Sequence, residues 1–205
     1  MSTQKPIQTL RLDGGILCLD FANTVSNRMK PENHDYLSGY KDLLVWSGHA
    51  GALSPKTINT LERLAKGYPQ KAAAVFNRSI QLRELIVRVL GRAMIQKQAA
   101  AEDMQLLNTF VAEAYANIEI GWQQSEERGV LHFNAPALEL VNWLLVKSLT
   151  DLYTSERLRQ VKQCPACGWL FLDKSRNGSR RWCNMATCGD VNKVQQWYQR
   201  KRKDQ

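Results

Sequence analysis

The 205-residue sequence has no long apolar segment and no leader-like beginning. No run approaches the roughly eighteen consecutive apolar residues that a membrane-spanning helix needs. The first eleven residues are polar and mixed, without the charged head and apolar block of a secretory signal. Both absences argue against a membrane-bound or secreted protein, so we expect a soluble, cytoplasmic one.

The sequence also lacks the short motifs that mark common catalytic sites. It contains no paired histidine metal motif, no glycine-rich phosphate loop and no nucleophile signature. An enzyme is a third hypothesis, with a pocket near Asp20, Asn23, Asn27, His34 or His49, but we expect no enzymatic activity. Asp20 and Asn23 follow an apolar run, and they are interpreted as a helix cap and its neighbour or as the lining of a ligand pocket.

Acidic residues are scarce only toward the C-terminus. Residues 1–156 hold 16 Lys and Arg against 16 Asp and Glu, whereas residues 157–205 hold 12 against 3. The whole net charge of +9 therefore lies in the second part. We expect two closely joined domains, a helical segment (1–156) and a basic segment (157–205). A compact basic module typically meets nucleic acid or an anionic membrane surface, and we expect double-stranded DNA.

Four of the five cysteines lie close together in the basic segment. Two residues separate Cys164 from Cys167, and four separate Cys183 from Cys188. Thiolates suit zinc, and two such pairs complete a closed tetrahedral site, which indicates one structural Zn²⁺. Two disulfides are the competing interpretation, which the reducing interior of a cell disfavours. Cys18 lies in a distant apolar run and is predicted to be a small buried hydrophobe.

Apolar residues at helical spacing dominate the helical segment. Ser54 and Pro55 suit the start of a helix, and six apolar residues between Leu82 and Ala93 form one face of a long helix. We predict a mainly α protein with small β elements. The first predicted element, within 16–24, is a buried strand or extended entry that passes into a helix near Asp20. The others are helices at 40–48, 55–67, 70–98 and 104–114, a β-hairpin within 118–133, and a central, almost uncharged helix after Pro136.

The basic segment is predicted to form a strand, a turn and a helix around the metal. Residues 169–172 are the strand, 173–178 the turn, and 190–203 the helix. Gly189 suits the crowded backbone beside the last ligand. The side chains predicted to contact DNA are all basic: Arg176, Arg180, Arg181, Lys193, Arg200, Lys201, Arg202 and Lys203.

These residues resemble the CGNR zinc finger family, bacterial proteins regarded as stress-induced transcription regulators. The likeness lies in the four cysteines and in the runs 169–175 and 181–189. Residues 19–24, Leu-Asp-Phe-Ala-Asn-Thr, are similar to the signature of the domain that accompanies this finger. The family pattern continues with Asn and Arg, where this chain has Asp190 and Val191. The resemblance implies a DNA-binding zinc finger, with any phosphate contact at those two positions weakened.

The leading hypothesis is a zinc-containing, DNA-binding transcription regulator. Its helical segment would respond to stress or to a small-molecule effector, or would form a homodimer. The alternative is a zinc-stabilised protein-interaction module without sequence-specific DNA binding. Closed four-cysteine sites hold many adaptor folds together, and a basic surface can meet an acidic partner.

Overall fold

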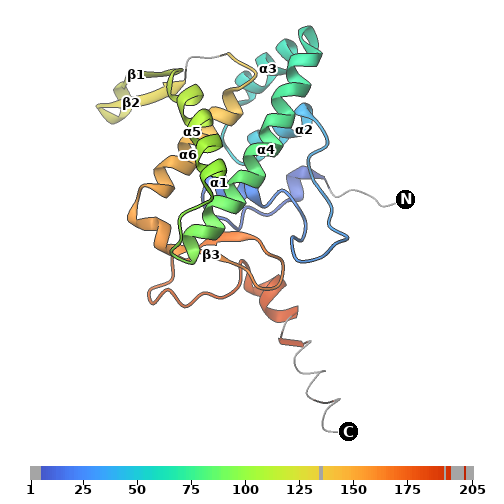
Figure 1. The fold of residues 1–205 in the computed structure, drawn as a ribbon. Helices are drawn as coiled ribbons and strands as arrows, with labels where there is room; N and C mark the ends of the chain where they lie inside the picture. Colours follow the sequence, from blue (N-terminus) through green and yellow to red (C-terminus); the bar gives the residue numbers. More distant parts are fainter. Residues whose placement is uncertain (1–5, 134–135, 192, 195–200, 202–205) are drawn as a thin grey trace.

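In the computed structural model, helices and two small antiparallel sheets surround one hydrophobic core (Figure 1). The structure describes residues 6–133, 136–191, 193, 194 and 201. The α-helices within these ranges are α1 (Leu17–Ala22), α2 (Tyr40–His49), α3 (Pro55–Gly67), α4 (Pro69–Met94), α5 (Ala101–Tyr115) and α6 (Leu140–Tyr153). The strands and short turns are β1 (Ile118–Gln123), β2 (Arg128–Phe133), β3 (Val161–Gln163), β4 (Leu170–Leu172), η1 (Ile7–Thr9), η2 (Gln124–Glu126), η3 (Glu156–Gln160) and η4 (Met185–Gly189). The predicted mainly α class with small β elements is confirmed.

Helix α6 lies at the centre of the fold, as the absence of charged residues between Glu139 and Lys147 predicts. It packs against α1, α2, α4 and α5 (Figure 1). Eight of its 14 residues are buried, so neighbours cover it on several sides. A charged side chain on those sides would lose its hydration, and this explains why the apolar stretch is so continuous.

Helix α3 begins at the predicted start signal, and helix α4 buries most of its predicted apolar face. The Ser54 side chain accepts a hydrogen bond from the N–H of Thr57 at 3.2 Å, and Pro55 is the first residue of α3. Helix α4 buries the predicted stripe as far as Leu90, while Ala93, its last member, is half-buried; the helix ends at Met94 rather than near Gln98. Although α4 has 26 residues, no described helix is both long and apolar enough to cross a membrane.

The segment before Asn23 differs from its prediction. Residues 16–19 form no strand, because helix α1 begins at Leu17 with Ile16 as its N-cap. Asp20 is therefore inside the helix rather than its cap, and its Oδ1 accepts a hydrogen bond from Gly14 N at 2.8 Å. Five of the six α1 residues are buried. A helix that is covered all round shows no periodic stripe, so the sequence could not distinguish it from a buried strand.

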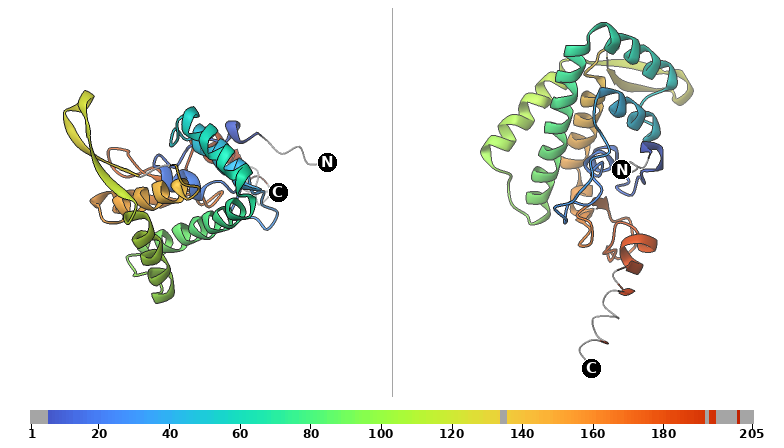
Figure 2. Two further views of the ribbon diagram at one scale, coloured as in Figure 1. Left: turned by 90° about the horizontal axis from the view of Figure 1, so that it is seen from above. Right: turned by 90° about the vertical axis from the view of Figure 1, so that its right-hand side faces the viewer.

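The predicted β-hairpin is present as β1 and β2, which pair from Ile118 with Phe133 at the base. Phe133 is buried, and its ring centroid lies 5.9 Å from that of Trp143 on α6. The outer end projects away from the helices (Figure 2). There Ile120 is 81% exposed and Trp122 is 64% exposed. These two side chains share one face of the strand, so that face is apolar and open to solvent in the single chain.

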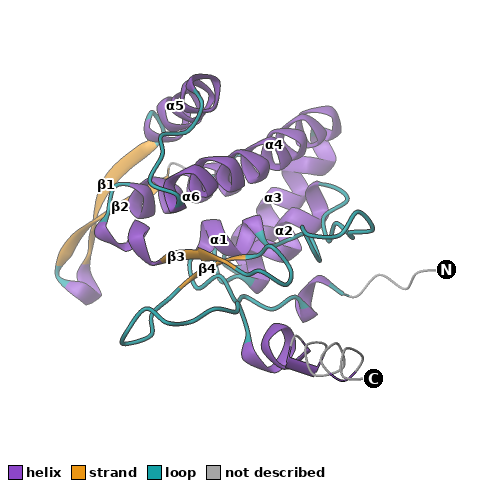
Figure 3. Cartoon of the chain, turned by 60° about the horizontal axis from the view of Figure 1, so that its bottom comes forward, coloured by secondary structure: helices purple, strands orange, loops and turns teal. Residues whose placement is uncertain are grey.

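The basic segment packs directly onto the helical segment. Strand β4 pairs antiparallel with β3, a strand that the sequence did not predict. Strand β4 also contacts α1 (Figure 3). The run from Trp169 to Leu172 is buried in the same hydrophobic core as α1 and α6. The division at residue 156 stays a prediction. The two segments are held together by a shared hydrophobic core.

Candidate metal centre and its link to the helices

The structure brings the four predicted metal ligands together. The sulfur atoms of Cys164, Cys167, Cys183 and Cys188 all lie within 4.8 Å of one another. The Sγ of Cys183 is 3.5 Å from that of Cys167 and 3.6 Å from that of Cys188. These separations are far longer than a disulfide bond. They are close to the roughly 3.8 Å between sulfurs that zinc–sulfur bonds of about 2.3 Å impose on a tetrahedron. All five cysteines are free, so the disulfide alternative finds no support.

The first knuckle, residues 164–168, is a tight backbone turn. The N–H of Gly168 donates to the carbonyl of Cys164 at 2.8 Å, and the N–H of Cys164 donates to the carbonyl of Trp169 at 2.8 Å. Gly168 has a φ of +75°, which side chains rarely adopt, and a Cβ there would lie 2.9 Å from the Cβ of Arg28. The turn thus depends on glycine, and it seats the first cysteine pair against the helical segment.

The second knuckle, residues 183–189, ends in the π-helical turn η4. The carbonyl of Asn184 accepts hydrogen bonds from Cys188 N at 3.0 Å and from Gly189 N at 3.2 Å. A Cβ at Gly189 would lie 2.6 Å from Met185 Sδ, which confirms the crowding expected beside the last ligand. The turn holds Cys183 and Cys188 toward the same point as the first pair.

The four thiols compete for ionisation because they are close and mostly buried. A hydrogen bond from Cys183 lowers the pKa of Cys167 to about 6. That same bond, together with burial, raises the pKa of Cys183 far above its usual range. Burial and the charge at Cys167 raise the pKa of Cys188 to about 12. Several thiolates can coexist here only beside a cation, so the chemistry of the site fits a divalent metal.

Asp173 organises the turn between the two knuckles. Burial acts to raise its pKa, but hydrogen bonds from Lys162 and Ser175 outweigh it and hold the pKa well below the usual range. Lys162 Nζ lies 2.7 Å from Asp173 Oδ2, which also accepts from the N–H of Arg180 at 2.9 Å. The loop that follows β4 is therefore held by a buried carboxylate rather than by apolar packing.

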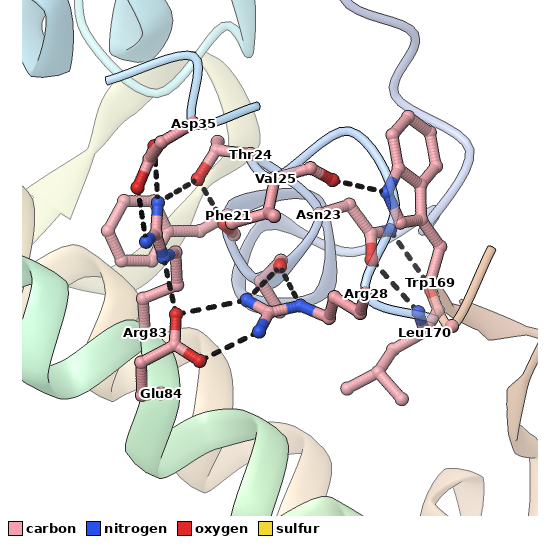
Figure 4. A network of polar contacts seen from close by, with 12 residues as sticks. Phe21, Asn23, Thr24, Val25, Arg28, Asp35, Arg83, Glu84, Trp169 and Leu170 are labelled. Carbon is pink, nitrogen blue, oxygen red and sulfur yellow. Dashed lines mark hydrogen bonds and ion pairs between the residues drawn. The ribbon is translucent and has the colours of Figure 1, made fainter. Parts of the chain in front are cut away.

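Asn23 joins the two segments, because its side-chain amide pairs with the backbone of Leu170 as a neighbouring strand would (Figure 4). Its Nδ2 donates to the carbonyl of Leu170 at 2.8 Å, and the N–H of Leu170 donates to its Oδ1 at 2.9 Å. Nearby, Trp169 Nε1 donates to the carbonyl of Val25 at 2.6 Å. The Leu-Asp-Phe-Ala-Asn-Thr run thus positions the strand that leaves the first knuckle.

A charged network anchors the same run to α4 (Figure 4). Arg83 is 3% exposed, binds both carboxylate oxygens of Asp35 at 2.8 and 2.6 Å, and donates to Thr24 Oγ1 at 3.1 Å. Arg28 pairs with Glu84 at 2.7 Å, and its N–H donates to the carbonyl of Cys167 at 2.8 Å. Sequence reasoning missed this network; its only signal was an arginine within the apolar stripe of α4.

Asp20 and Asn23, the two residues of the predicted ligand pocket, are both buried in the structure. Asp20 is 8% exposed and Asn23 is 1% exposed, and both side chains bond to backbone groups. Burial raises the pKa of Asp20 to about 6, although the N–H groups of Gly14 and Gly15 oppose the rise. Asn23 thus stabilises the junction and Asp20 fixes the turn at Gly14, while the ligand pocket stays a prediction.

The predicted DNA-contacting residues fall into three groups. Arg176, Arg181, Lys193 and Lys201 are exposed. Arg180 is instead directed inward, because its Nε donates to the carbonyl of Trp182 at 2.9 Å, its Nη2 donates to that of Cys183, and its guanidinium lies 4.7 Å from the Phe171 ring centroid. It supports the second knuckle. Arg200, Arg202 and Lys203 lie outside the described residues.

Two protein-family models match the chain. Residues 160–201 match the CGNR zinc finger. Residues 15–156 match ABATE, described as "Putative stress-induced transcription regulator", and this match spans more than half of the chain. The chain belongs to the ABATE family. The ABATE match ends at residue 156 and the CGNR match begins at residue 160, so they lie on either side of most of η3. The predicted family is confirmed, and no curated protein matches the chain.

Proposed function

We propose that this protein is a zinc-containing, DNA-binding transcription regulator of the cytoplasm. The observation that carries the proposal is the placement of exposed cations around the cysteine cluster. Arg176 and Arg181 extend from the loop between the knuckles, and Lys193 follows the second knuckle. The helical segment has no net charge to compete with them. The family descriptions support a regulator.

Zinc is the ion that best suits the four-cysteine cluster. All four ligand positions are thiols, and three of the cysteines are buried. A closed four-thiolate site is structural, because it leaves no open position for a substrate. Cys164 and Cys167 would fix the start of β4, while Cys183 and Cys188 would fix the turn η4; the helix predicted at 190–203 lies largely outside the described residues. We expect one zinc per chain by metal quantification, and a metal content near zero would overturn this assignment.

The departure from the family pattern weakens one edge of the proposed surface. Asp190 and Lys193 are three residues apart, with a carboxylate oxygen 3.8 Å from the Lys193 Nζ. The pair is exposed, so it offsets charge without adding much stability. Val191 is 54% exposed where the family has a cation. We therefore assign the larger share of phosphate contact to the loop that carries Arg176 and Arg181.

An anisotropy titration with duplex DNA tests the proposal. Wild-type affinity should fall steeply with salt, because each neutralised phosphate contributes about −0.9 to the log-log slope. Replacing Arg176 and Arg181 together with Ala should weaken binding and reduce the magnitude of the slope by nearly 2. The control variant replaces Arg63 and Lys66, two exposed cations of α3, and removes the same charge far from the cluster.

Absence of binding at low salt by the zinc-loaded protein would overturn the proposal. Equal losses in the loop variant and the α3 variant would also count against it, because they would indicate a response to net charge alone. Capture of a protein partner that survives nuclease treatment, without DNA binding, would favour the protein-interaction alternative.

A further inference from the structure

A cavity of about 500 Å³ lies between the two family segments. One wall comes from residues 9–11 and from the loop that includes Ser26, Asn27 and Tyr36. The opposite wall comes from both knuckles, including Cys167 and Thr187. The volume is within the range of small-molecule sites, which are commonly clefts of about 300–1,000 Å³ at a junction between structural units.

Apart from the metal-ligand cysteines Cys167 and Cys188, the charged side chains that line this junction cleft are both cations. Arg11 and Lys30 line it, and no carboxylate is among its described lining residues. The Arg11 side chain is 40% exposed, with its Nε 3.1 Å from Asp13 and its guanidinium 5.9 Å from the Trp169 ring centroid. Two cations at one cleft attract an anionic group, and the low-dielectric wall around them strengthens that attraction.

The cleft also has uncommitted hydrogen-bonding capacity. Thr187 Oγ1 is buried and has no hydrogen-bond partner among the described residues. Ser26 Oγ accepts from His34 N at 2.8 Å, so its own proton can still be donated. Burying an unpaired hydroxyl is costly, and such groups in native structures commonly serve a ligand, ion or water.

The remaining lining is apolar and too extensive for a bare inorganic ion. Leu10, Ala166, Trp169 and Val191 line the cleft beside the polar groups. A ligand that contacts both the cationic and the apolar lining carries an acidic group and an apolar body.

We propose that the junction cleft binds a small organic anion. Its carboxylate or phosphate would lie near Arg11 and Lys30, accepting from the Thr187 hydroxyl, and its apolar part would lie against Trp169. Binding does not depend on the proposed DNA function. Its regulatory consequence does rest on that function: Cys167, Cys188 and Val191 line the cleft, so an occupant would contact both knuckles and the residue that follows Asp190.

Isothermal titration of the zinc-loaded full chain tests the proposal with 2-naphthyl phosphate as the probe. Its matched comparisons are 2-naphthol, which lacks the charge, and inorganic phosphate, which lacks the apolar body. We expect naphthyl phosphate to bind at least about tenfold more tightly than either, as expected for a charge-assisted hydrogen bond combined with apolar burial. Similar affinity for naphthyl phosphate and naphthol would overturn the anionic assignment.

Two variants locate the binding. Lys30→Gln should weaken naphthyl phosphate about tenfold, whereas Lys56→Gln, an exposed lysine of α3, should not change it. Thr187→Val should weaken binding without lowering the unfolding temperature, because the hydroxyl has no internal partner to lose. Unchanged affinity in both Lys30→Gln and Thr187→Val would overturn the site.

DNA phosphate is the other source of the same chemistry. If a short duplex displaces naphthyl phosphate, and Lys30→Gln lowers DNA affinity as the Arg176 and Arg181 substitutions do, the cleft belongs to the DNA surface and the small-ligand proposal fails. If the protein binds no DNA but still binds naphthyl phosphate through Lys30, the proposed function fails while this inference holds.

Discussion

At the scale of single residues, Asn23 is the side chain that most directly connects the helices to the metal site. One primary amide satisfies both the N–H and the carbonyl of Leu170, at 2.9 and 2.8 Å. Leu170 is 1% exposed, so water cannot replace these bonds. Asparagine is suited to this task because its side chain carries the same donor and acceptor as a peptide group.

Replacing Asn23 with Ala should lower the free energy of unfolding by about 3 kcal/mol, because it leaves a buried N–H and a buried carbonyl unpaired. Denaturant unfolding measures the loss, and faster hydrogen exchange at the Leu170 amide locates it. Asn117→Ala is the matched control, since that amide makes one bond to Glu113 O on a half-buried helix end. A loss no larger than that of the control would contradict the role given to Asn23.

At the scale of elements, the β1–β2 hairpin has two unlike ends. Its base is fixed by Phe133 against Trp143, whereas Ile120, Trp122 and Leu131 near its outer end are at least 49% exposed. Ile120 and Leu131 are directly opposed in the register, so they reinforce one apolar face. An isolated two-stranded hairpin is marginally stable, and its base contacts must therefore carry most of its stability.

Phe133→Ala should cost about 3 kcal/mol or more of unfolding free energy, because it opens a cavity beside α6. Trp122→Thr should change stability by less than about 0.5 kcal/mol in dilute protein, because the ring is already in water. Thermal or urea unfolding of both variants distinguishes the two ends. Comparable losses would show that Trp122 is covered in solution, for example in the predicted homodimer, which stays a prediction.

At the scale of the whole molecule, the basic segment and the helical segment differ in net charge but share one hydrophobic core. All of the formal net charge lies in the first, and the second is neutral. Yet the buried run 169–172 belongs to the same core as α1 and α6. The charged surface is thus attached to the helices through a shared core. A change at the cysteine cluster should therefore also lower the stability of the helical segment.

Cys183→Ser should abolish stoichiometric zinc binding and lower the unfolding midpoint by roughly 10 °C, taking at least about 3 kcal/mol for a lost metal ligand and about 2–4 °C per kcal/mol for a chain of this size. Most of the helical circular dichroism should persist at room temperature, because α2–α6 bury their own apolar faces.

Cys18→Ala is the control for this substitution. Burial raises the pKa of Cys18 to about 12, and this thiol lies outside the metal cluster, so the variant should keep its zinc. Complete loss of helical signal in Cys183→Ser would contradict the division at residue 156. An unchanged midpoint would contradict the shared core.

Sequence patterns predicted most elements that repeat or have a local signal. Ser54 starts α3 through a bond to a residue three positions away, and the α4 stripe repeats over several turns. The strand β3 has only three residues, too few for a pattern. Arg180 was assigned to DNA because a sequence shows its charge but not the carbonyls of Trp182 and Cys183 that bind it.

The sequence by itself determined the ligand set, the charge division, the family and the mainly helical class, because each depends on residue type and short spacing. Only the tertiary structure decided what Asp20, Asn23 and Arg83 do. Asn23 and Leu170 are 147 positions apart, and Arg83 and Asp35 are 48 apart. No local pattern records such pairs, because they come together only when the core brings α1, α4 and β4 into contact.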